Sequence, residues 1–398
     1  METKRVIVLA GYPFPIGMAA TTRIIAYSSG LEAHGIHVDI VNYSHVAPDA
    51  EVYPDSGTVE GVHYIYAYHR AGSRNRFKRR IYDNIISMYR SIRLIAKLNR
   101  EHPVDYVFLS FDSVLNLSVF VLPLYWMGLR LIFIGDEYPI PIRERLKEAI
   151  PRVKYQFYRF ISRFLVARIL MTAGLKDYYN NIYSLPTYLL STIVNEKRFQ
   201  NLSSIEKRDA NYVCYMGNLE LAKDNVDNII RAFALIHKKF PTLIFRIYGP
   251  RTPENESLTR LVTELKVEKY IEFMGCVSSN RVPEILASAT LLVSSQPQTK
   301  RAQGGFPTKL GEYLLSGTPS LFTDVGEISQ YVSHGKEVWL ARPCDPSDFA
   351  EKMDYILEHY QEAEFVARRG RAFVLNHFTA EKATEGLVEF LNHLKLHN

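Results

Sequence analysis

Residues 304–319 carry the residue types of an anion-binding site. Their sequence is Gly-Gly-Phe-Pro-Thr-Lys-Leu-Gly-Glu-Tyr-Leu-Leu-Ser-Gly-Thr-Pro. Gly304 and Gly305 would let the backbone approach a ligand closely, and Pro307 suits the first turn of a helix. That helix would present its N-terminal amides to an anion, together with the ammonium group of Lys309. The alternative is a capped helix that has only a structural role.

A carboxylate follows on the same predicted helix. Glu312 comes three residues after Lys309, so both side chains would lie on roughly one helix face. A carboxylate accepts hydrogen bonds from two hydroxyl groups at once, and acidic residues hold the ribose diol in other nucleotide-binding folds. We therefore expect Glu312 to bind a sugar diol, unless it simply lies on the helix surface.

Two further glycine-bearing turns each join a predicted strand to a predicted helix. One runs from Gly11 to Gly17, and the other contains Gly217, Asn218 and Lys223. Neither has the spacing of a dinucleotide fingerprint or a P-loop. Turns of this kind bind phosphate at a helix N-terminus, and a lysine there adds a point charge. The alternatives are a tight turn and a solvated lysine.

Two adjacent carboxylates, Asp136 and Glu137, follow a predicted strand at 131–134. Carboxylates at such a place can orient or deprotonate a substrate hydroxyl, or one of them can cap the next helix. The three cysteines stand far apart at positions 214, 276 and 344, so none of them pairs at metal-ligand spacing. We expect no metal site.

These candidate residues all follow strands in a chain that alternates strands with helices. In the first half, β-branched runs predict strands at 6–10, 38–41, 62–68, 104–109, 131–134 and 189–192. A second series is predicted at 212–216, 243–248, 271–274, 291–294, 320–323 and 338–340. Strands separated by helices indicate βαβ units and parallel sheets. Ligands bind beyond the carboxyl ends of the strands in such sheets.

The length of 398 residues predicts two domains. The polar stretch 193–209 separates the two strand series, so we expect an N-terminal domain over 1–195 and a C-terminal domain over 205–378. Two facing sheets would leave a cleft between the domains, where small molecules usually bind. A last helix at 379–396 either completes the second domain or packs back on the first.

Charge divides unevenly along the chain. The net charge of +6 combines +8 in residues 1–200 with −2 in residues 201–398. Residues 70–100 hold ten Lys or Arg against Asp83 alone, beside an apolar helical stripe that we expect to be core. Residues 152–168 mix cations with aromatic side chains. These cations either are simply solvated or meet an anionic membrane surface.

The same composition excludes several classes of protein. The charge is too mild, and lacks a recognition motif, for a nucleic-acid-binding protein. The N-terminal apolar run is too short for a signal peptide, and residues 114–134 are interrupted by Asn116, Ser118, Pro123 and Arg130, which argues against a membrane span. We expect a cytoplasmic protein, with peripheral docking on the inner face of the membrane as an open alternative.

With these motifs in place, the chain resembles the family-4 glycosyltransferases with the GT-B fold, which has two facing Rossmann-like domains. The resemblance rests on residues 217–223, 273–277, 305–314 and 317–319, with the glycine loop at 11–17 matching in position, and it is strongest over 211–335. It implies a retaining enzyme that moves a sugar from a UDP- or GDP-type nucleotide sugar to a saccharide or lipid-linked acceptor. The pathway implied is surface polysaccharide biosynthesis.

The resemblance also implies roles for individual residues. Glu312 would hold the nucleotide ribose, Lys223 would contact the diphosphate, and Cys276 and Val277 would lie beside the base. The full donor-binding set would be Gly17, Gly217, Asn218, Lys223, Cys276, Val277, Gly304, Gly305, Phe306, Thr308, Lys309, Leu310 and Glu312. Asp136, Glu137 and Lys223 would be catalytic, and no metal or other cofactor would be needed.

The chain departs from the family pattern at two positions. Gly304 stands where many members have the first Glu of a Glu-x7-Glu motif, and Asn218 stands where many have Arg. Gly304 removes a carboxylate that would contact the donor sugar. Asn218 removes a positive charge near the diphosphate, and Lys309 would replace that charge. Two alternatives stay open: another GT-B enzyme, such as a nucleotide-sugar epimerase, and a non-catalytic partner that binds a nucleotide sugar.

Overall fold

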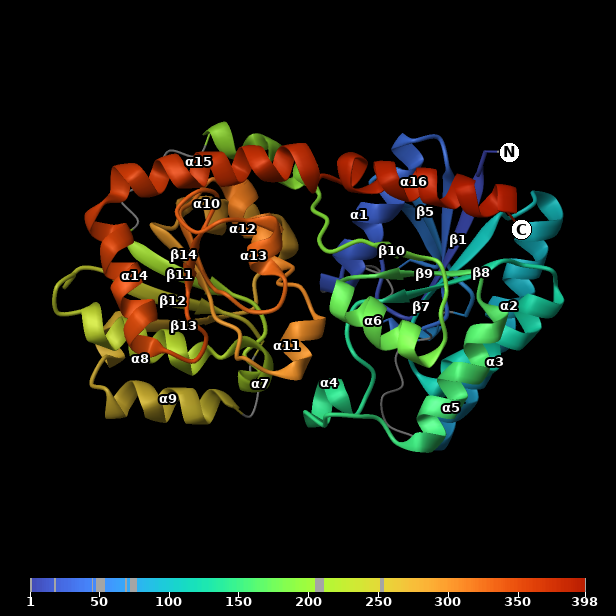
Figure 1. Cartoon of the computed structure of the whole chain (residues 1–398), viewed down its shortest axis with the longest axis horizontal. Helices are drawn as coiled ribbons and strands as arrows, with labels where there is room; N and C mark the ends of the chain where they lie inside the picture. The colour runs from blue at the N-terminus through green and yellow to red at the C-terminus, as the bar shows by residue number, and fades with distance from the viewer. Residues whose placement is uncertain are drawn as a thin grey trace. The chain divides into compact units, whose positions relative to one another are not determined.

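The chain forms two compact units, shown in Figure 1. The computed structural model describes residues 2–17, 19–44, 46–47, 54–68, 70–71, 77–204, 211–250 and 254–397. Unit 1 comprises Met1–Ile193 with Ala380–Asn398, and unit 2 comprises Val194–Thr379. The last helix, α16 (Ala380–His397), thus belongs to unit 1, where it packs against α1 (Ala19–Ala33).

Unit 1 is built on an eight-stranded sheet of order β10-β9-β8-β7-β1-β2-β5-β4. Its strands are β1 (Arg5–Ala10), β2 (His37–Asn42), β4 (Ser56–Val59), β5 (Val62–Tyr66), β7 (Tyr106–Ser110), β8 (Leu131–Gly135), β9 (Ala167–Leu170) and β10 (Thr187–Leu189). All neighbours are parallel except β4 and β5. The apolar runs of β1, β7 and β8 are fully buried because helices cover both faces of a parallel sheet. The strand order reverses between β1 and β7.

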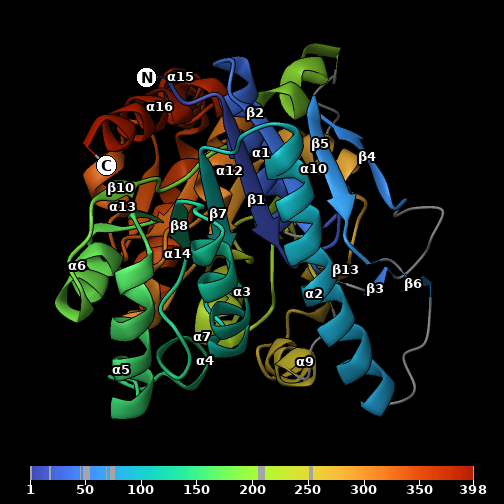
Figure 2. The ribbon, with the colours of Figure 1, turned by 90° about the vertical axis from the view of Figure 1, so that its right-hand side faces the viewer.

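The helices of unit 1 are α1, α2 (Phe77–Glu101), α3 (Val114–Trp126), α4 (Ile142–Arg145), α5 (Arg152–Ile161), α6 (Ala173–Ile182) and α16, with a 3-10 turn at Ser162–Phe164. Helices α2, α3 and α5 lie side by side (Figure 2). A two-residue pair, β3 (Val46–Ala47) with β6 (Arg70–Ala71), completes the unit. Among the described residues, no helix combines the length and apolarity that crossing a bilayer requires.

The apolar stripe expected as core on α2 is only partly buried. Met88 and Ile95 are buried, but Ile85 is 62% exposed. The buried face of this helix also carries Ser87 and Ser91. Ser87 donates its hydroxyl hydrogen to the backbone oxygen of Tyr43, so the buried face includes polar side chains that the apolar pattern did not mark.

Unit 2 is built on a six-stranded parallel sheet of order β13-β12-β11-β14-β15-β16. Its strands are β11 (Tyr212–Met216), β12 (Ile244–Tyr248), β13 (Ile271–Gly275), β14 (Leu291–Ser294), β15 (Ser320–Thr323) and β16 (Trp339–Ala341). The chain leaves β11 toward β12 and β13, and then returns to β14 on the other side. The order therefore reverses between β11 and β14, the point at which open α/β sheets bind ligands.

The helices of unit 2 are α7 (Leu221–Asp224), α8 (Val226–Ile236), α9 (Glu254–Glu264), α10 (Val282–Ser288), α11 (Lys300–Gly304), α12 (Lys309–Ser316), α13 (Ile328–Tyr331), α14 (Pro346–Glu358) and α15 (Tyr360–His377). Three 3-10 helices join them: η2 (Glu196–Ser204), η3 (Glu268–Tyr270) and η4 (Ser279–Arg281). The structure differs from the sequence predictions in several elements. Helices α11 and α13 and strand β4 were not predicted, and the strand expected at 189–192 ends at Leu189.

Candidate functional site

The turn after β11 is closed by the side chain of Lys309. The amide of Gly217 donates to the backbone oxygen of Tyr248, at 3.0 Å. A Cβ atom on Gly217 would lie 2.1 Å from Cε of Lys309 and 2.6 Å from its Nζ. Only glycine leaves room for this close approach. The turn and the lysine, far apart in sequence, therefore form one site.

Lys309 is fixed by a buried acid. Its ammonium group pairs with the Asp224 carboxylate, which is 1% exposed at the end of α7. The ammonium also lies 5.1 Å from the ring centroid of Tyr215, within the range of a cation–π contact. Burial and the neighbouring Asp224 carboxylate raise the pKa of Tyr215 well above its usual value. The result is a positioned cation at the carboxyl end of β11.

Helix α12 presents its N-terminus to the same place. Thr308 is its N-cap residue, and its side chain makes no capping hydrogen bond. The expected position of Pro307 in the first turn is wrong, since the helix begins at Lys309 and Pro307 accepts from the Leu310 amide at 2.8 Å. Farther along, the hydroxyl of buried Tyr313 accepts from the amide of Met216 at 2.9 Å. This bond fixes α12 to the end of β11.

Glu312 is paired with an arginine that sequence analysis missed. Its Oε1 atom meets Nη1 of Arg198, which lies on η2. Arg198 also donates to Ser279, through Nη2, at 2.9 Å to the backbone oxygen. No local pattern pointed to Arg198, because its partners come from segments far along the chain.

The two adjacent glycines lie at the end of α11, before α12 begins. Gly304 is the last residue of α11, and Gly305 follows with an extended backbone at φ −99°. A Cβ atom on Gly305 would meet nothing closer than the backbone oxygen of Arg301, at 3.6 Å. Neither turn geometry nor packing within unit 2 thus requires glycine at position 305. Phe306 is buried against Tyr331, with ring centroids 5.1 Å apart.

Helix α11 is tied to the turn that follows β11. Thr299 accepts from the amide of Ala302 and so caps the helix. Arg301, a buried residue of this helix, places Nη1 2.7 Å from Oε1 of Glu220. This ion pair joins the loop at Gly217–Glu220 to the segment that ends at Gly304.

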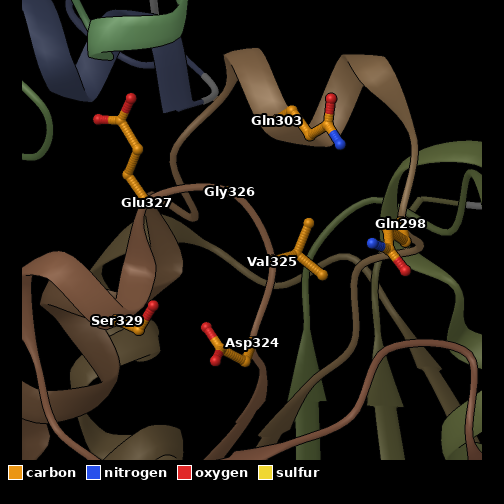
Figure 3. Close-up of a pocket in the computed structure, with 7 residues that line it drawn as sticks. All are labelled: Gln298, Gln303, Asp324, Val325, Gly326, Glu327 and Ser329. Atoms are coloured by element: carbon orange, nitrogen blue, oxygen red, sulfur yellow. The ribbon is translucent and has the colours of Figure 1, made fainter.

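A cavity of about 350 Å³ lies beyond the carboxyl ends of β14 and β15 (Figure 3). It is lined by Gln298, Gln303, Asp324, Val325, Gly326, Glu327 and Ser329. Gly326 has φ +68°, and a Cβ atom there would lie 2.9 Å from the backbone oxygen of Ala302. The loop that bears Asp324 therefore packs directly on α11, beside Gly304.

The other unit 2 residues expected at the donor site follow β11 or β13, or lie on α12. Lys223 is half-buried on α7, and the backbone oxygen of Asn218 accepts from the buried Tyr215 hydroxyl. Cys276 is exposed and Val277 half-buried, just after β13 at the edge of the sheet. Leu310 is fully buried, so its side chain belongs to the core.

Gly17, Asp136 and Glu137 belong to unit 1. A Cβ atom on Gly17 would lie 2.0 Å from Oγ1 of Thr21, so the loop before α1 requires glycine there. Asp136 Oδ1 lies 3.1 Å from Nε of Arg23. Glu137 Oε2 lies 3.7 Å from Nε of Arg143, and α4 has Pro141 at its N-cap. Both carboxylates thus face arginines, and neither is the N-cap of α4.

A half-buried tyrosine, Tyr12, lies near Asp136. Burial, followed by the carboxylates of Asp136 and Asp112, raises the pKa of Tyr12 to about 12. Its hydroxyl therefore stays neutral throughout the pH range in which proteins function. Within the described ranges, no three His, Cys, Asp or Glu side chains cluster as metal ligands would.

Comparisons with known proteins place these features in a family. Residues 210–359 match the family of glycosyl transferases group 1. N-acetyl-alpha-D-glucosaminyl L-malate synthase of Bacillus anthracis is 24% identical over 195 residues, which span 49% of this chain and 48% of that protein. The match therefore covers about half of each protein.

Solved structures resemble the whole chain. Sucrose-phosphate synthase from Thermosynechococcus elongatus has a TM-score of 0.73 at 15% identity, over 99% of this chain and 100% of that one. HepE of Anabaena, solved with UDP and glucose, has a TM-score of 0.70 at 14% identity, over 98% of this chain and 100% of that one. The predicted GT-B fold is confirmed. Residues 210–359 thus match the group 1 glycosyltransferases, and the two parallel-sheet units of the chain have the GT-B fold.

Proposed function

We propose that this protein is a retaining enzyme that transfers a sugar from a nucleoside-diphosphate sugar to a saccharide or lipid-linked acceptor in surface polysaccharide biosynthesis. One observation carries the proposal. The ammonium group of Lys309 lies over the Gly217 turn where the strand order of unit 2 reverses, beside the open N-terminus of α12. A cation, a glycine turn and helix amides together form a site for a diphosphate.

The chemistry explains why such a site promotes transfer. The bond between the anomeric carbon and the phosphate oxygen breaks, and the leaving diphosphate keeps the electron pair. The acceptor oxygen bonds to the anomeric carbon and loses its proton, and the sugar passes through an oxocarbenium-like state. Lys309, Lys223 and the α12 amides stabilise the charge that grows on the diphosphate, without a metal.

The cavity of Figure 3 is suited to the donor sugar. Its polar lining combines the Gln298 and Gln303 amides with the Asp324 carboxylate, groups that accept from and donate to hydroxyls. The loop of Asp324 packs against α11, at whose end Gly304 replaces the first family carboxylate. Asp324 supplies the carboxylate that position 304 lacks.

Unit 1 provides the acceptor side. Asp136 and Glu137 orient or deprotonate the acceptor hydroxyl, while Arg23 and Arg143 hold them in place. Turnover that stays at the wild-type rate in both Asp136→Asn and Glu137→Gln would remove these two residues from the mechanism.

Unit 1 also docks on an anionic membrane through helices α2, α3 and α5. Trp126 on α3 is 76% exposed and Val153 on α5 is 82% exposed, on helices that lie side by side (Figure 2). The exposed arginines Arg152, Arg159 and Arg163 accompany them, a mixture typical of interfacial surfaces, whereas Arg168 of the same stretch is buried and takes no part. Of the basic stretch 70–100, residues 72–76 lie outside the described residues, as do the side chains of 70–71 and 77–81.

The decisive experiment combines binding with turnover. Thermal shift with UDP- and GDP-sugars should raise the melting temperature with one of them, since a ligand of the native state stabilises it. The sugar should then be transferred to a glycan or glycolipid acceptor, with activity unchanged by EDTA. Epimerisation without an acceptor would support the epimerase alternative, and binding without any turnover would support the non-catalytic one.

A further inference from the structure

Arg198 connects three segments of unit 2 that are distant in sequence. It lies on η2, and its Nη1 atom pairs with Oε1 of Glu312 on α12, 114 residues away. Its Nη2 atom donates to Ser279 of η4, at 2.9 Å to the backbone oxygen and 3.3 Å to Oγ. Arg198 and Glu312 are both partly buried.

The use of two different nitrogens fixes the plane of the guanidinium group. An arginine held through both ends of its fork loses its rotational freedom, and so does its carboxylate partner. The pair engages Oε1 of Glu312, while Oε2 makes no hydrogen bond among the described residues. Glu312 therefore presents one oriented, charged acceptor instead of a freely rotating side chain.

Arg198 also contacts the loop that is expected to bind the base, through Ser279. Ser279 comes three residues after Cys276, and both lie in the loop that follows β13. Arg198 thus sets the position of this loop relative to the carboxylate on α12. A nucleoside spans the same two places, because its base and its ribose hydroxyls lie at opposite ends.

We infer that Arg198 is a positioning residue for the nucleoside of the donor, a role that rests on the proposed function. It directs Oε2 of Glu312 toward a ribose hydroxyl and holds the 276–281 loop at the spacing that a nucleoside requires. Arg198 itself does not contact the reacting atoms. Its contribution passes through Glu312 and therefore depends on the ribose hydroxyls.

That dependence supplies a test. Binding of UDP and GDP, and of their 2′-deoxy forms, is measured by calorimetry in wild type, Arg198→Ala, Glu312→Gln and the double variant. Arg198→Ala should weaken binding of the preferred ribonucleotide about tenfold, the size of one hydrogen bond to a charged group. Binding of the 2′-deoxy form should change much less, and the double variant should bind no more weakly than Glu312→Gln.

Two further variants keep the test decisive. Arg198→Lys retains the charge and loses the fork, and it replaces Arg198→Ala if that variant does not fold. It too should weaken binding of the ribonucleotide more than binding of the 2′-deoxy form. Arg246→Ala breaks a matched pair in unit 2, with Nε 2.9 Å from Oε2 of Glu272, and should leave both affinities unchanged.

The contrary outcomes are distinct. Equal weakening of the ribo and deoxy forms would reduce Arg198 to a structural clamp and overturn the inference. Tighter ribonucleotide binding in Arg198→Ala would also overturn it, because Arg198 would then compete with ribose for Glu312. If wild-type protein binds no nucleoside diphosphate, the proposed function fails and takes the inference with it.

Discussion

The ammonium group of Lys309 meets the carboxylate of Asp224, a side chain that is 1% exposed. The two residues lie 85 positions apart, one at the start of α12 and the other at the end of α7. Lys309 is therefore both part of the expected diphosphate site and the charge partner of a buried acid. Substitutions at these two residues can test the binding role and the stabilising role separately.

Lys309→Met should destabilise the protein as well as weaken donor binding. The Asp224 carboxylate would stay buried without its partner, which costs about 3 kcal/mol of unfolding free energy. In the double variant Asp224→Asn/Lys309→Met, most of that stability should return while donor affinity stays low. Urea unfolding and donor titration measure the two quantities.

Lys239→Met provides the matched control for stability. Lys239 pairs with Asp354 at 2.7 Å on the exposed surface of unit 2, where solvent screens an ion pair and it contributes little to stability. A loss of stability in Lys309→Met no larger than in this control would show that Asp224 does not depend on Lys309.

Gly217→Ala should displace Lys309 without unfolding the protein. The new Cβ would lie 2.1 Å from Cε of Lys309, whose flexible end can move away. Donor affinity should fall about tenfold, as expected when a charged contact is lost. Gly305→Ala is the comparison variant. Its Cβ would make only an ordinary contact at 3.6 Å, so the melting temperature of this variant should not change. Wild-type affinity in Gly217→Ala would argue against a diphosphate contact by Lys309.

Asp324→Asn should affect the sugar and spare the nucleotide. The side chain lines the cavity beside α11 (Figure 3), so the variant should bind the nucleotide sugar about fivefold to tenfold more weakly. Binding of the free nucleoside diphosphate should not change. Equal losses for both ligands would place Asp324 outside the sugar site. Calorimetry with the nucleotide sugar and with the free nucleoside diphosphate measures the two affinities.

Membrane docking should depend on unit 1 alone. Trp126→Glu/Val153→Glu should reduce sedimentation with phosphatidylglycerol vesicles, because it adds negative charge to an exposed apolar surface. Leu235→Glu, at a position 61% exposed in unit 2, should bind vesicles as the wild type does. Binding that does not differ between vesicles with and without anionic lipid would contradict the docking surface.

Tyr12 should make stability fall with rising pH under alkaline conditions. Its folded pKa is about 12, raised by burial and by Asp136 and Asp112, against an ordinary value of 10.0. Between these values the unfolded chain loses a proton that the folded chain keeps, so the free energy of unfolding falls by roughly 2–3 kcal/mol. Tyr12→Phe should remove this part of the decline in denaturant titrations from pH 9 to pH 12. An identical decline in wild type and variant would show that Tyr12 titrates normally.

The elements of the site could be predicted because their signals are local. Strands of a parallel sheet are buried on both faces, and they stand out as short apolar runs such as Tyr212–Met216. Glycine turns and helix starts lie next to those runs. The order of strands and helices through unit 2 therefore followed from sequence almost completely.

The partners of the site residues could not be predicted in this way. Arg198 with Glu312, Lys309 with Asp224, and Arg301 with Glu220 join positions 114, 85 and 81 residues apart. Periodicity and spacing describe contacts within one element, and these pairs arise only when the sheet brings distant loops together. Helix α11 was missed because five residues are too few for a periodic signal, although Thr299 is a recognisable N-cap.

The packing of α16 has a consequence for how the protein is made. Leu391 accepts a 2.9 Å hydrogen bond from the Tyr106 hydroxyl, and Ala380 lies so close to α1 that a Cβ on Gly30 would come within 2.1 Å of its oxygen. During synthesis, unit 1 therefore begins first and lacks this helix until residues 380–397 leave the ribosome. Unit 2, continuous in sequence, is the first unit with every residue available for folding, which reverses the usual N-to-C order.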